Sequence, residues 1–484
     1  MENISRDSQP ATQAMDYTLL GGEHLERGKR LFTTGLVLLA AALGYLGYTA
    51  NTENSLHVFQ GLLILTLSVL PGLLWAKTGG SRFPVFETIM LLCANSYALP
   101  LLNVREQMAD YSDEVITRSG WLVVLYVICA NVVYRVTRGD PGRGSFWTES
   151  LLSPGIERSV IYGLPVSALY VGISVFTDWI PPALGSVLRA VFFGLSILCT
   201  FISAQRWGRG ELTQGEKSLF VCSLVPQMIF MSVGLVLIGA ISQVGIALLG
   251  YLSGGKRIPW VVMLVTFAIL AVLHTGKSRM REKYWEGELP QPGLTQLADY
   301  YGEWFEYGLQ KAEEKKAASR RLLERTSLMH ILCLIGSYTP QRQDYLYGST
   351  YRHVLPQLIP RFFWPEKPKS HIATYELSIY YGIQREEDTE TTTIAFGLLA
   401  EAYANFGLFG AILLGTFWGF TLKKLQIWST FSPMLSFAGL MMVLLTAWAF
   451  NSELTMAAWI SSFQQALVVV LGVPFLIKNL LGGN

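Results

Sequence analysis

Long apolar runs are the sequence feature that most constrains this chain. They recur along it, and most approach the roughly 20 residues that a helix needs to cross a bilayer. Apolar residues make up 51% of the sequence and charged residues only 15%, against roughly 25% charged in an average soluble domain. The sequence therefore predicts an all-α polytopic membrane protein. The clearest runs lie near 31–50, 56–76, 83–102, 119–136, 159–179, 185–204, 258–275, 393–422, 431–450 and 455–477.

Basic residues predict the orientation of these runs, because loops rich in lysine and arginine remain in the cytoplasm. Residues 1–30 are polar, end in Arg27, Lys29 and Arg30, and lack the short apolar core of a signal peptide. We therefore expect a cytoplasmic N-terminal tail. The other predicted cytoplasmic loops are 77–82, 137–158 and 205–217.

Two stretches leave the path of the chain open. Residues 218–254 are too long for one crossing and short for two, so a hairpin of two helices and one helix bent at Pro226 both fit. We favour the hairpin, because it keeps Lys256 and Arg257 in the cytoplasm. The apolar stretch 327–337 is short for a crossing and is more typical of a re-entrant or buried helix. Either interpretation gives about twelve transmembrane helices.

Four parts are predicted along the chain. The tail at 1–30 is followed by a first transmembrane bundle at 31–275, by an external loop region at 276–392 with amphipathic or re-entrant helices, and by a C-terminal transmembrane bundle at 393–484. Within the loop region, Lys311 to Arg325 predicts an amphipathic helix. Either path of the chain places 338–392 outside the cell membrane.

The external segment 338–392 combines proline, aromatic and basic residues in a way that a simple linker does not need. Arg352, Arg361 and Lys367 supply positive charge just outside the membrane. Arginine suits phosphate because its planar guanidinium donates two hydrogen bonds at once. The alternative is that these cations only contact lipid headgroups.

Arg189 is a second candidate for binding an anion. It lies about one turn inside the external end of the sixth apolar run. A charged side chain at that depth is costly and usually faces a cavity or a partner. The alternative is that Arg189 extends to the nearby interface and contacts only headgroups.

The span after the loop carries the third candidate feature. Gly397, Glu401 and Asn405 are spaced i, i+4, i+8, so a helix beginning near 393 would stack them on one face. Glu401 would lie about 12 Å below the external end at 1.5 Å per residue. A carboxylate there is a candidate general base. It is also a candidate organiser that pairs with a loop cation such as Arg361 or Lys367, or with Asn405 to lock helices together.

Several classes of site find no support in the sequence. The six histidines and the carboxylates show no metal-ligand spacing, so we predict no metal site. No P-loop or dinucleotide fingerprint follows a strand, and the net charge of +2 argues against nucleic acid as a partner. The five cysteines fit neither a disulfide framework nor a zinc site.

Three short segments resemble the O-antigen polymerase (Wzy-type) family of oligosaccharide repeat-unit polymerases. The first is Gly348-Ser-Thr-Tyr351, and the second is Ile359-Pro-Arg361-Phe-Phe-Trp-Pro365-Glu-Lys367-Pro368. The third runs from Gly397 through Glu401-Ala-Tyr403-Ala-Asn405 to Gly407. The rest of the chain is similar to that family only in having many spans and one large late external loop.

The resemblance implies a C-type glycosyltransferase fold and a place in the bacterial cytoplasmic (inner) membrane. Such an enzyme transfers a growing glycan from undecaprenyl pyrophosphate to another lipid-linked repeat unit, and needs no cofactor. A flippase and a chain-length regulator are then candidate partners beside the membrane lipids. The implied catalytic residues are Glu401, Arg361 and His353, with His371 as a further candidate base, and the implied substrate-binding residues are Arg189, Arg352, Lys367, Tyr351, Trp364 and Asn405.

Other functions fit the same features less well. An O-antigen ligase-type transferase uses related chemistry with a lipid A core as acceptor. A polysaccharide transporter or flippase is expected to show repeats and paired broken helices near the middle of the membrane, and no repeat is evident. A non-catalytic scaffold leaves the basic, proline-rich loop unexplained.

Overall fold

The computed structural model describes residues 24–78, 83–104, 108–151, 154–180, 182–286, 289–309, 327–359, 363–390, 393–430, 432–433, 435–472, 474–475 and 479. Within these residues the protein is all helical, apart from an isolated bridge between Ser150 and Ser436. The predicted all-α class is therefore confirmed. Seven described segments are long and apolar enough to cross a membrane, and the count of about twelve stays a prediction. These seven are Gly28–Tyr48, Ser55–Lys77, Val85–Leu102, Asp113–Val136, Glu157–Phe176, Trp260–Lys277 and Leu398–Trp428.

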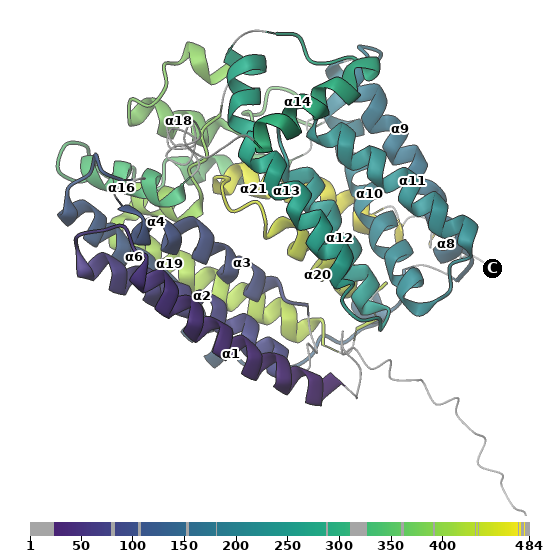
Figure 1. The fold of residues 1–484 in the computed structure, drawn as a ribbon, viewed down its shortest axis with the longest axis horizontal. Coiled ribbons are helices and arrows are strands. Elements are labelled where there is room, and N and C mark those ends of the chain that lie inside the picture. The colour runs from purple at the N-terminus through teal and green to yellow at the C-terminus, as the bar shows by residue number, and fades with distance from the viewer. Residues whose placement is uncertain are drawn as a thin grey trace, which may run out of the picture.

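Two groups of helices lie on either side of α20 and α21, as Figure 1 shows. The first group includes α1, α2, α3, α6 and α19, and the second includes α9 to α13. The first group and its neighbours at the centre form the main apolar core, which also takes in part of α10. The bounds in the first group are α1 His24–Tyr48, α2 Ser55–Lys77, α3 Val85–Cys93, η1 Ala94–Ala98, α4 Leu99–Leu102 and α6 Asp113–Val136.

Polar caps fix where several of these helices begin. The side chain of Asn54 accepts a hydrogen bond from the Leu56 amide at the start of α2, and Ser112 caps α6 in the same way through Val115. Such caps satisfy amides that have no partner within the helix. Thr213 and Glu216 form a reciprocal capping box at the start of α11.

The favoured hairpin at 218–254 is confirmed. Two helices, α11 and α12, replace the single bent helix, and the chain turns between Ser232 and Ile238. Leu235 in this turn has a φ of +57°, and its carbonyl accepts a hydrogen bond from Arg281 at 3.1 Å. The bounds in this group are α7 Ser145–Thr148, α8 Pro154–Ser159, η2 Val160–Tyr162, α9 Gly163–Phe176, α10 Pro182–Arg209, α11 Gln214–Ser232, α12 Ile238–Ser253 and α13 Trp260–Arg281.

Short helices replace long ones between α13 and α19. The stretch near 327–337 forms α16, whose apolar residues are buried against α6 and α19. The helix expected at Lys311 to Arg325 lies outside the described residues. The elements here are η3 Glu282–Glu286, η4 Leu294–Gln296, α14 Leu297–Leu309, α16 Leu328–Tyr338, η5 Thr350–His353, α17 Val354–Gln357, α18 Ile372–Tyr380 and η6 Glu387–Glu390. We call the end of the molecule where η5, α17 and α18 lie the loop end.

The long helix α19 (Leu398–Trp428) is broken at Gly407, which has a φ of +59° and a ψ of −139°. A Cβ at Gly410 would overlap the backbone of Ala402, so the segments before and after the break pack closely. The helix also begins later than predicted. Gly397, with a φ of +76°, is its N-cap, so Glu401 lies in the first turn rather than deep in a span. The remaining elements are α20 Phe437–Trp448, α21 Met456–Leu467 and η7 Val468–Gly472.

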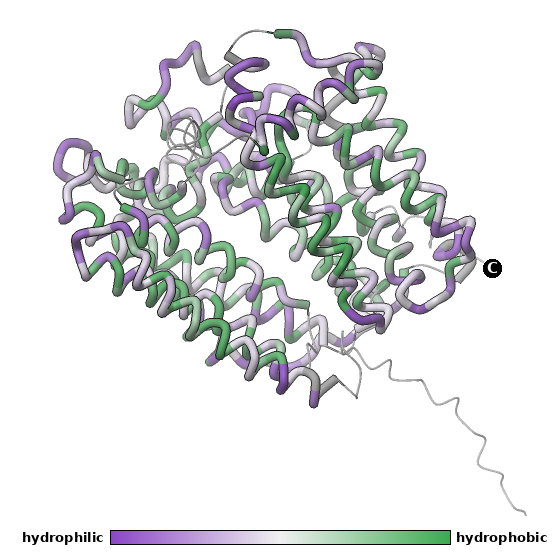
Figure 2. Tube along the Cα trace, in the orientation of Figure 1, coloured by the Kyte–Doolittle hydropathy of each residue, from purple (hydrophilic) through white to green (hydrophobic). Residues whose placement is uncertain are grey.

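Apolar side chains also cover much of the outside. Figure 2 shows hydrophobic residues along most of α13, and Val261 and Phe267 on this helix are 76% and 72% exposed. Exposed apolar surface of this extent marks contact with a membrane or a partner. Together with the seven long apolar segments, it identifies a membrane protein.

Candidate functional site

The carboxylate of Glu401 lies at the centre of a buried hydrogen-bonded group at the loop end. Its side chain is completely buried. One oxygen accepts from the Thr350 hydroxyl at 2.9 Å, and the other accepts from the Met456 amide at 2.7 Å. Met456 is the first residue of α21, where amides lack partners within the helix and the helix dipole favours negative charge. Glu401 therefore caps α21 from another part of the chain.

Asn405 completes this group one turn further along α19. Its amide nitrogen donates to the Thr350 hydroxyl at 2.8 Å and to the Glu401 carbonyl at 2.8 Å. Its side-chain oxygen accepts from the Gly348 amide at 2.9 Å. We call Gly348, Thr350, Glu401, Asn405 and the Met456 amide the buried frame. It joins η5, α19 and α21 through paired polar groups, as buried polar atoms require.

The break at Gly407 supplies two more bonds to the same loop. Because the helix stops there, the carbonyls of Ala404 and Asn405 are free to accept from the Leu346 and Tyr347 amides, at 3.0 and 3.1 Å. A Cβ at Gly407 would lie 2.7 Å from the Tyr345 hydroxyl. The backbone of 345–350 is thus held against the end of the first α19 segment.

Charged side chains gather on the outer side of this loop. The Glu376 carboxylate on α18 lies 2.7 Å from the Arg352 guanidinium and 2.8 Å from Nε2 of His353. When Nε2 of His353 carries a proton, it donates that proton to Glu376. It then cannot accept from the Arg352 Nε, so the 3.3 Å between these two nitrogens is a contact without a hydrogen bond. We call Arg352, His353 and Glu376 the exposed cluster, because the Arg352 side chain is 65% exposed.

Tyr351 lies between the buried frame and the exposed cluster in the chain. Its ring stacks on Phe406, with ring centres 6.0 Å apart and planes 5° from parallel. Burial raises the pKa of the Tyr351 phenol, and the charge of Glu401 raises it further. The hydroxyl therefore stays a neutral donor at physiological pH.

The second half of the loop is organised around Lys367. This side chain is buried, and its ammonium donates to the Ile359 carbonyl at 2.8 Å and the Gln357 carbonyl at 3.4 Å. Lys367 thus stabilises the backbone of its own loop. Trp364 is 39% exposed. Arg361, expected to bind pyrophosphate, lies outside the described residues.

Arg189 lies apart from these groups in the contacts that the structure records. It is an exposed residue of α10, and its charge acts on Tyr170 of α9. Among the described residues it makes no hydrogen bond or ion pair with the buried frame or the exposed cluster. Its convergence with Arg352 and Arg361 on one pyrophosphate stays a prediction.

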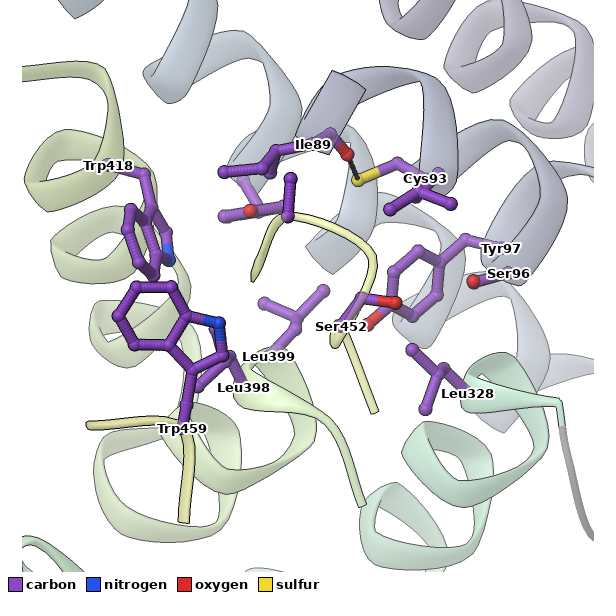
Figure 3. A pocket seen from close by; sticks show the side chains of 13 residues that line it. Ile89, Cys93, Ser96, Tyr97, Leu328, Leu398, Leu399, Trp418, Ser452 and Trp459 are labelled. Atoms are coloured by element: carbon purple, nitrogen blue, oxygen red, sulfur yellow. Dashed lines mark hydrogen bonds between the residues drawn. The ribbon is translucent and has the colours of Figure 1, made fainter. Parts of the chain in front are cut away.

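A small cavity lies at the start of α19, where Leu398 and Leu399 line it (Figure 3). Its volume of about 40 Å³ has room for a few water molecules, since one needs roughly 10–15 Å³ by this measure. Leu398 and Leu399 contribute one wall, next to Glu401, and the rings of Trp418 and Trp459 lie close together at another. The cavity is too small to hold a sugar or a similar ligand.

No group of three or more metal-ligating side chains is found among the described residues. The five cysteines are all free thiols. Burial lowers the pKa of His371, which precedes α18 and approaches Tyr375. His371 is therefore mostly neutral near pH 7.

Sequence reasoning found part of this site. It identified Glu401, Asn405, Tyr351, Arg352 and His353, which the structure places along one loop and the helix end beside it. It did not predict the two described donors to the Glu401 carboxylate, the Thr350 hydroxyl and a backbone amide. Lys367 donates to backbone carbonyls instead, and a bond from Arg361 stays a prediction. Sequence reasoning also missed Glu376. Thr350 stood within a motif already singled out, whereas nothing in the spacing pointed to Glu376 or Met456.

Comparison with known proteins adds one match. A family model described as a domain of unknown function (DUF8712) matches residues 227–430, from within α11 to the end of α19. This range contains η5, α18 and the Glu401 helix, but neither α20 nor α21. No curated protein and no solved structure matches the chain.

Proposed function

We propose that the protein is a membrane glycosyltransferase that polymerises undecaprenyl-pyrophosphate-linked oligosaccharide repeat units into a surface polysaccharide, an O-antigen or exopolysaccharide. One observation carries this proposal. The segments 348–351 and 397–407, which resemble the polymerase family, form one hydrogen-bonded unit through Thr350, Glu401 and Asn405. That unit carries the exposed Arg352 and, beside it, the largely buried His353, both in contact with Glu376.

The reaction needs positive charge and a base at the same place. The acceptor hydroxyl attacks the anomeric carbon of the donor sugar, the bond from that carbon to the pyrophosphate oxygen breaks, and the electron pair leaves with undecaprenyl pyrophosphate. Arg352, with Arg361, would stabilise the charge that develops on the leaving group. His353 would accept the hydroxyl proton, held in place by Glu376 as a general base often is.

Glu401 and Asn405 are positioning residues in this mechanism. Both Glu401 oxygens already accept hydrogen bonds, and the side chain is completely buried. A base must reach the proton that it removes. His353 is the better candidate, because 11% of its side chain is exposed and it adjoins the exposed Arg352 guanidinium, whereas Glu401 is completely buried. Tyr351 and Trp364 would stack on sugar rings beside the cluster. The site would face the outside of the bacterial cytoplasmic membrane.

A deletion strain tests the function directly. Loss of a polymerase leaves a single lipid-linked repeat unit in place of long polymer, which a glycan gel resolves. Loss of a ligase-type transferase leaves polymer on undecaprenyl pyrophosphate, and loss of a flippase leaves the repeat unit on the cytoplasmic side. Either of the last two results would overturn the proposal.

Purified protein with lipid-linked repeat units then tests the site. Removing Arg352 should slow polymerisation about 10- to 100-fold, because an interaction with a charged group is worth roughly 1.5–3 kcal/mol. Arg342→Ala is the matched control, since Arg342 is an exposed arginine of the same loop whose guanidinium lies 5.6 Å from the Tyr338 ring centre. Equal activity of Arg352→Ala and the control would remove Arg352 from the mechanism.

A further inference from the structure

A row of basic residues ends helix α13, outside the site described above. His274, Lys277 and Arg281 are spaced i, i+3 and i+7, so they share one face of the helix. The charges of Lys277 and Arg281 also act on one another and on His274. Like charges held together in a partly buried place favour an anion between them. We call Lys277 and Arg281 the α13 cation pair.

Internal contacts use only part of this pair. One guanidinium nitrogen of Arg281 donates a hydrogen bond to the Leu235 carbonyl at 3.1 Å, and the guanidinium carbon lies 4.1 Å from the Trp285 ring centre. Its Nε is buried and has no hydrogen-bond partner among the described residues. Lys277 is partly buried and, in the described part of the chain, makes no hydrogen bond or ion pair. Donors therefore remain for a ligand.

The rest of α13 offers an apolar surface to the same ligand. Trp260 and Phe267 are 63% and 72% exposed, and they precede His274 and Arg281 at intervals of seven residues, so they share the helix face of the cation pair. A hydrocarbon chain is stabilised on such a surface, and a phosphate on the cations. The ligand that fits both is a lipid with a phosphate-bearing headgroup.

Glu453 links this surface to the buried frame. Its negative charge acts on both Lys277 and Arg281, while its side chain stays exposed. The Glu453 carbonyl accepts a hydrogen bond from the Gly397 amide at 2.9 Å, and Gly397 is the N-cap of the helix that carries Glu401. The cation pair thus lies on the side of the molecule that carries the candidate site.

We propose that Lys277 and Arg281 bind the phosphate of a lipid whose hydrocarbon chain lies along the exposed face of α13. Two lipids share this chemistry: an anionic phospholipid of the bilayer and a polyprenyl diphosphate. The site is argued from α13 and its neighbours alone, so it does not depend on the proposed polymerase activity.

Binding to the full-length protein in phosphatidylcholine nanodiscs tests the site. Phosphatidylglycerol, undecaprenyl pyrophosphate and free inorganic pyrophosphate are added separately, and retained lipid is measured by native mass spectrometry. Lys277→Gln should weaken lipid binding roughly tenfold, the effect of about one charge-assisted hydrogen bond. Glu453→Gln should strengthen binding, because it removes the negative charge that competes with phosphate and keeps the backbone carbonyl.

The control is the double variant Lys256→Gln with Arg257→Gln, which removes two exposed basic residues just before the other end of α13. It should bind lipid like the wild type. Weaker binding by Lys277→Gln for both lipids assigns a general phospholipid site, and weakening confined to undecaprenyl pyrophosphate assigns a diphosphate site. Unchanged binding in Lys277→Gln, or equal weakening in the control, overturns the proposal. None of these measurements requires turnover, so a failed polymerase assay leaves them interpretable.

Discussion

The buried frame and the exposed cluster each contain one carboxylate, and the two carboxylates have opposite circumstances. Glu401 is completely buried and bonds a hydroxyl and a backbone amide. Glu376 is partly exposed and bonds an arginine and a histidine. A buried carboxylate without donors is strongly unfavourable, so every bond that Glu401 makes is needed to keep it there. Glu376 keeps contact with solvent and can exchange partners.

This difference separates positioning from chemistry. The buried frame connects parts of the chain that are distant in sequence, and each of its side-chain acceptor atoms already accepts a hydrogen bond within the protein. The exposed cluster lies on the loop that the frame fixes, with a guanidinium that solvent reaches. We therefore expect changes in the frame to act first on folding, and changes in the cluster to act first on turnover.

Gly407→Ala should have the largest effect on stability, because it strains the backbone at the helix break that holds the loop of the buried frame. A side chain at its φ and ψ costs about 1–3 kcal/mol, and the added Cβ would also overlap the Tyr345 hydroxyl. We expect a clear fall in apparent melting temperature and in the yield of monodisperse protein in detergent. Gly302→Ala is the control, since Gly302 lies within α14 with open space around it and an alanine there should do no harm. Equal melting temperatures for Gly407→Ala and Gly302→Ala would contradict the helix break at Gly407.

Substitutions at Glu401 should have the next largest effect on stability, and the loss should depend on whether the new side chain keeps a hydrogen-bond acceptor. Glu401→Leu leaves the Thr350 hydroxyl and the Met456 amide without an acceptor, at about 1–3 kcal/mol for each buried group. Glu401→Gln keeps one acceptor for the amide and offers its nitrogen to Thr350. We expect Leu to lower the melting temperature strongly and Gln to lower it only slightly, measured by thermal unfolding in detergent.

The same pair of variants distinguishes positioning from base catalysis. A positioning Glu401 predicts that folded Glu401→Gln retains measurable polymerisation. A stable Glu401→Gln that binds donor normally and shows no turnover would instead make Glu401 the base, and the comparison of the two carboxylates would fail.

Within the exposed cluster, Arg352→Lys should act on turnover and leave stability nearly unchanged. A lysine keeps the charge but cannot bond Glu376 and a phosphate with one planar group. We expect a loss of roughly tenfold in polymerisation rate and a melting temperature close to that of the wild type. Glu376→Gln should also slow turnover, because it frees His353 to adopt other orientations. A large stability loss in either variant would show that the exposed cluster, like the buried frame, acts mainly on folding.

Acidification should produce the smallest effect, which we expect at α18. Burial lowers the pKa of His371 in the folded protein, so stability is complete above its ordinary pKa of about 6.5 and declines as pH falls below it. His371 precedes α18, which carries Glu376. Amide exchange in α18, corrected for intrinsic rates, should be faster at acidic than at neutral pH. His371→Gln should remove much of this difference, and an unchanged response would exclude His371 as its origin.

Sequence patterns predicted the helices better than their ends. The apolar runs predicted the all-helical class and the hairpin of α11 and α12, because both depend on hydrophobic length and on loop charge. The start of α19 was wrong by several residues, since Gly397 adopts a positive φ that composition does not reveal. The break at Gly407, which ends one helical segment and begins another, likewise depends on a positive φ that the apolar pattern does not reveal.

The candidate site was predictable where side chains carry the contacts and not where the backbone does. The spacing of Glu401 and Asn405 correctly placed them on one face, since four residues make about one turn. The hydrogen bond from the Met456 amide to Glu401 could not be predicted from the sequence. Every residue except proline has a backbone amide donor, and only the tertiary fold determines which one meets the carboxylate. Glu376 was missed for a related reason: a single acidic residue on the short helix α18, within the predicted external loop, carries no periodic signal.

The bond between Glu401 and the first amide of α21 also has a consequence for biosynthesis. The chain is made from its N-terminus, so Glu401 is inserted before the residue that satisfies it has been translated. Until Met456 is made, the carboxylate has only one of its two donors available, the Thr350 hydroxyl. A nascent chain interrupted before Met456 thus presents an incomplete loop end to cellular proteases. The buried frame is therefore complete only after α21, near the C-terminal end of the chain, has been made.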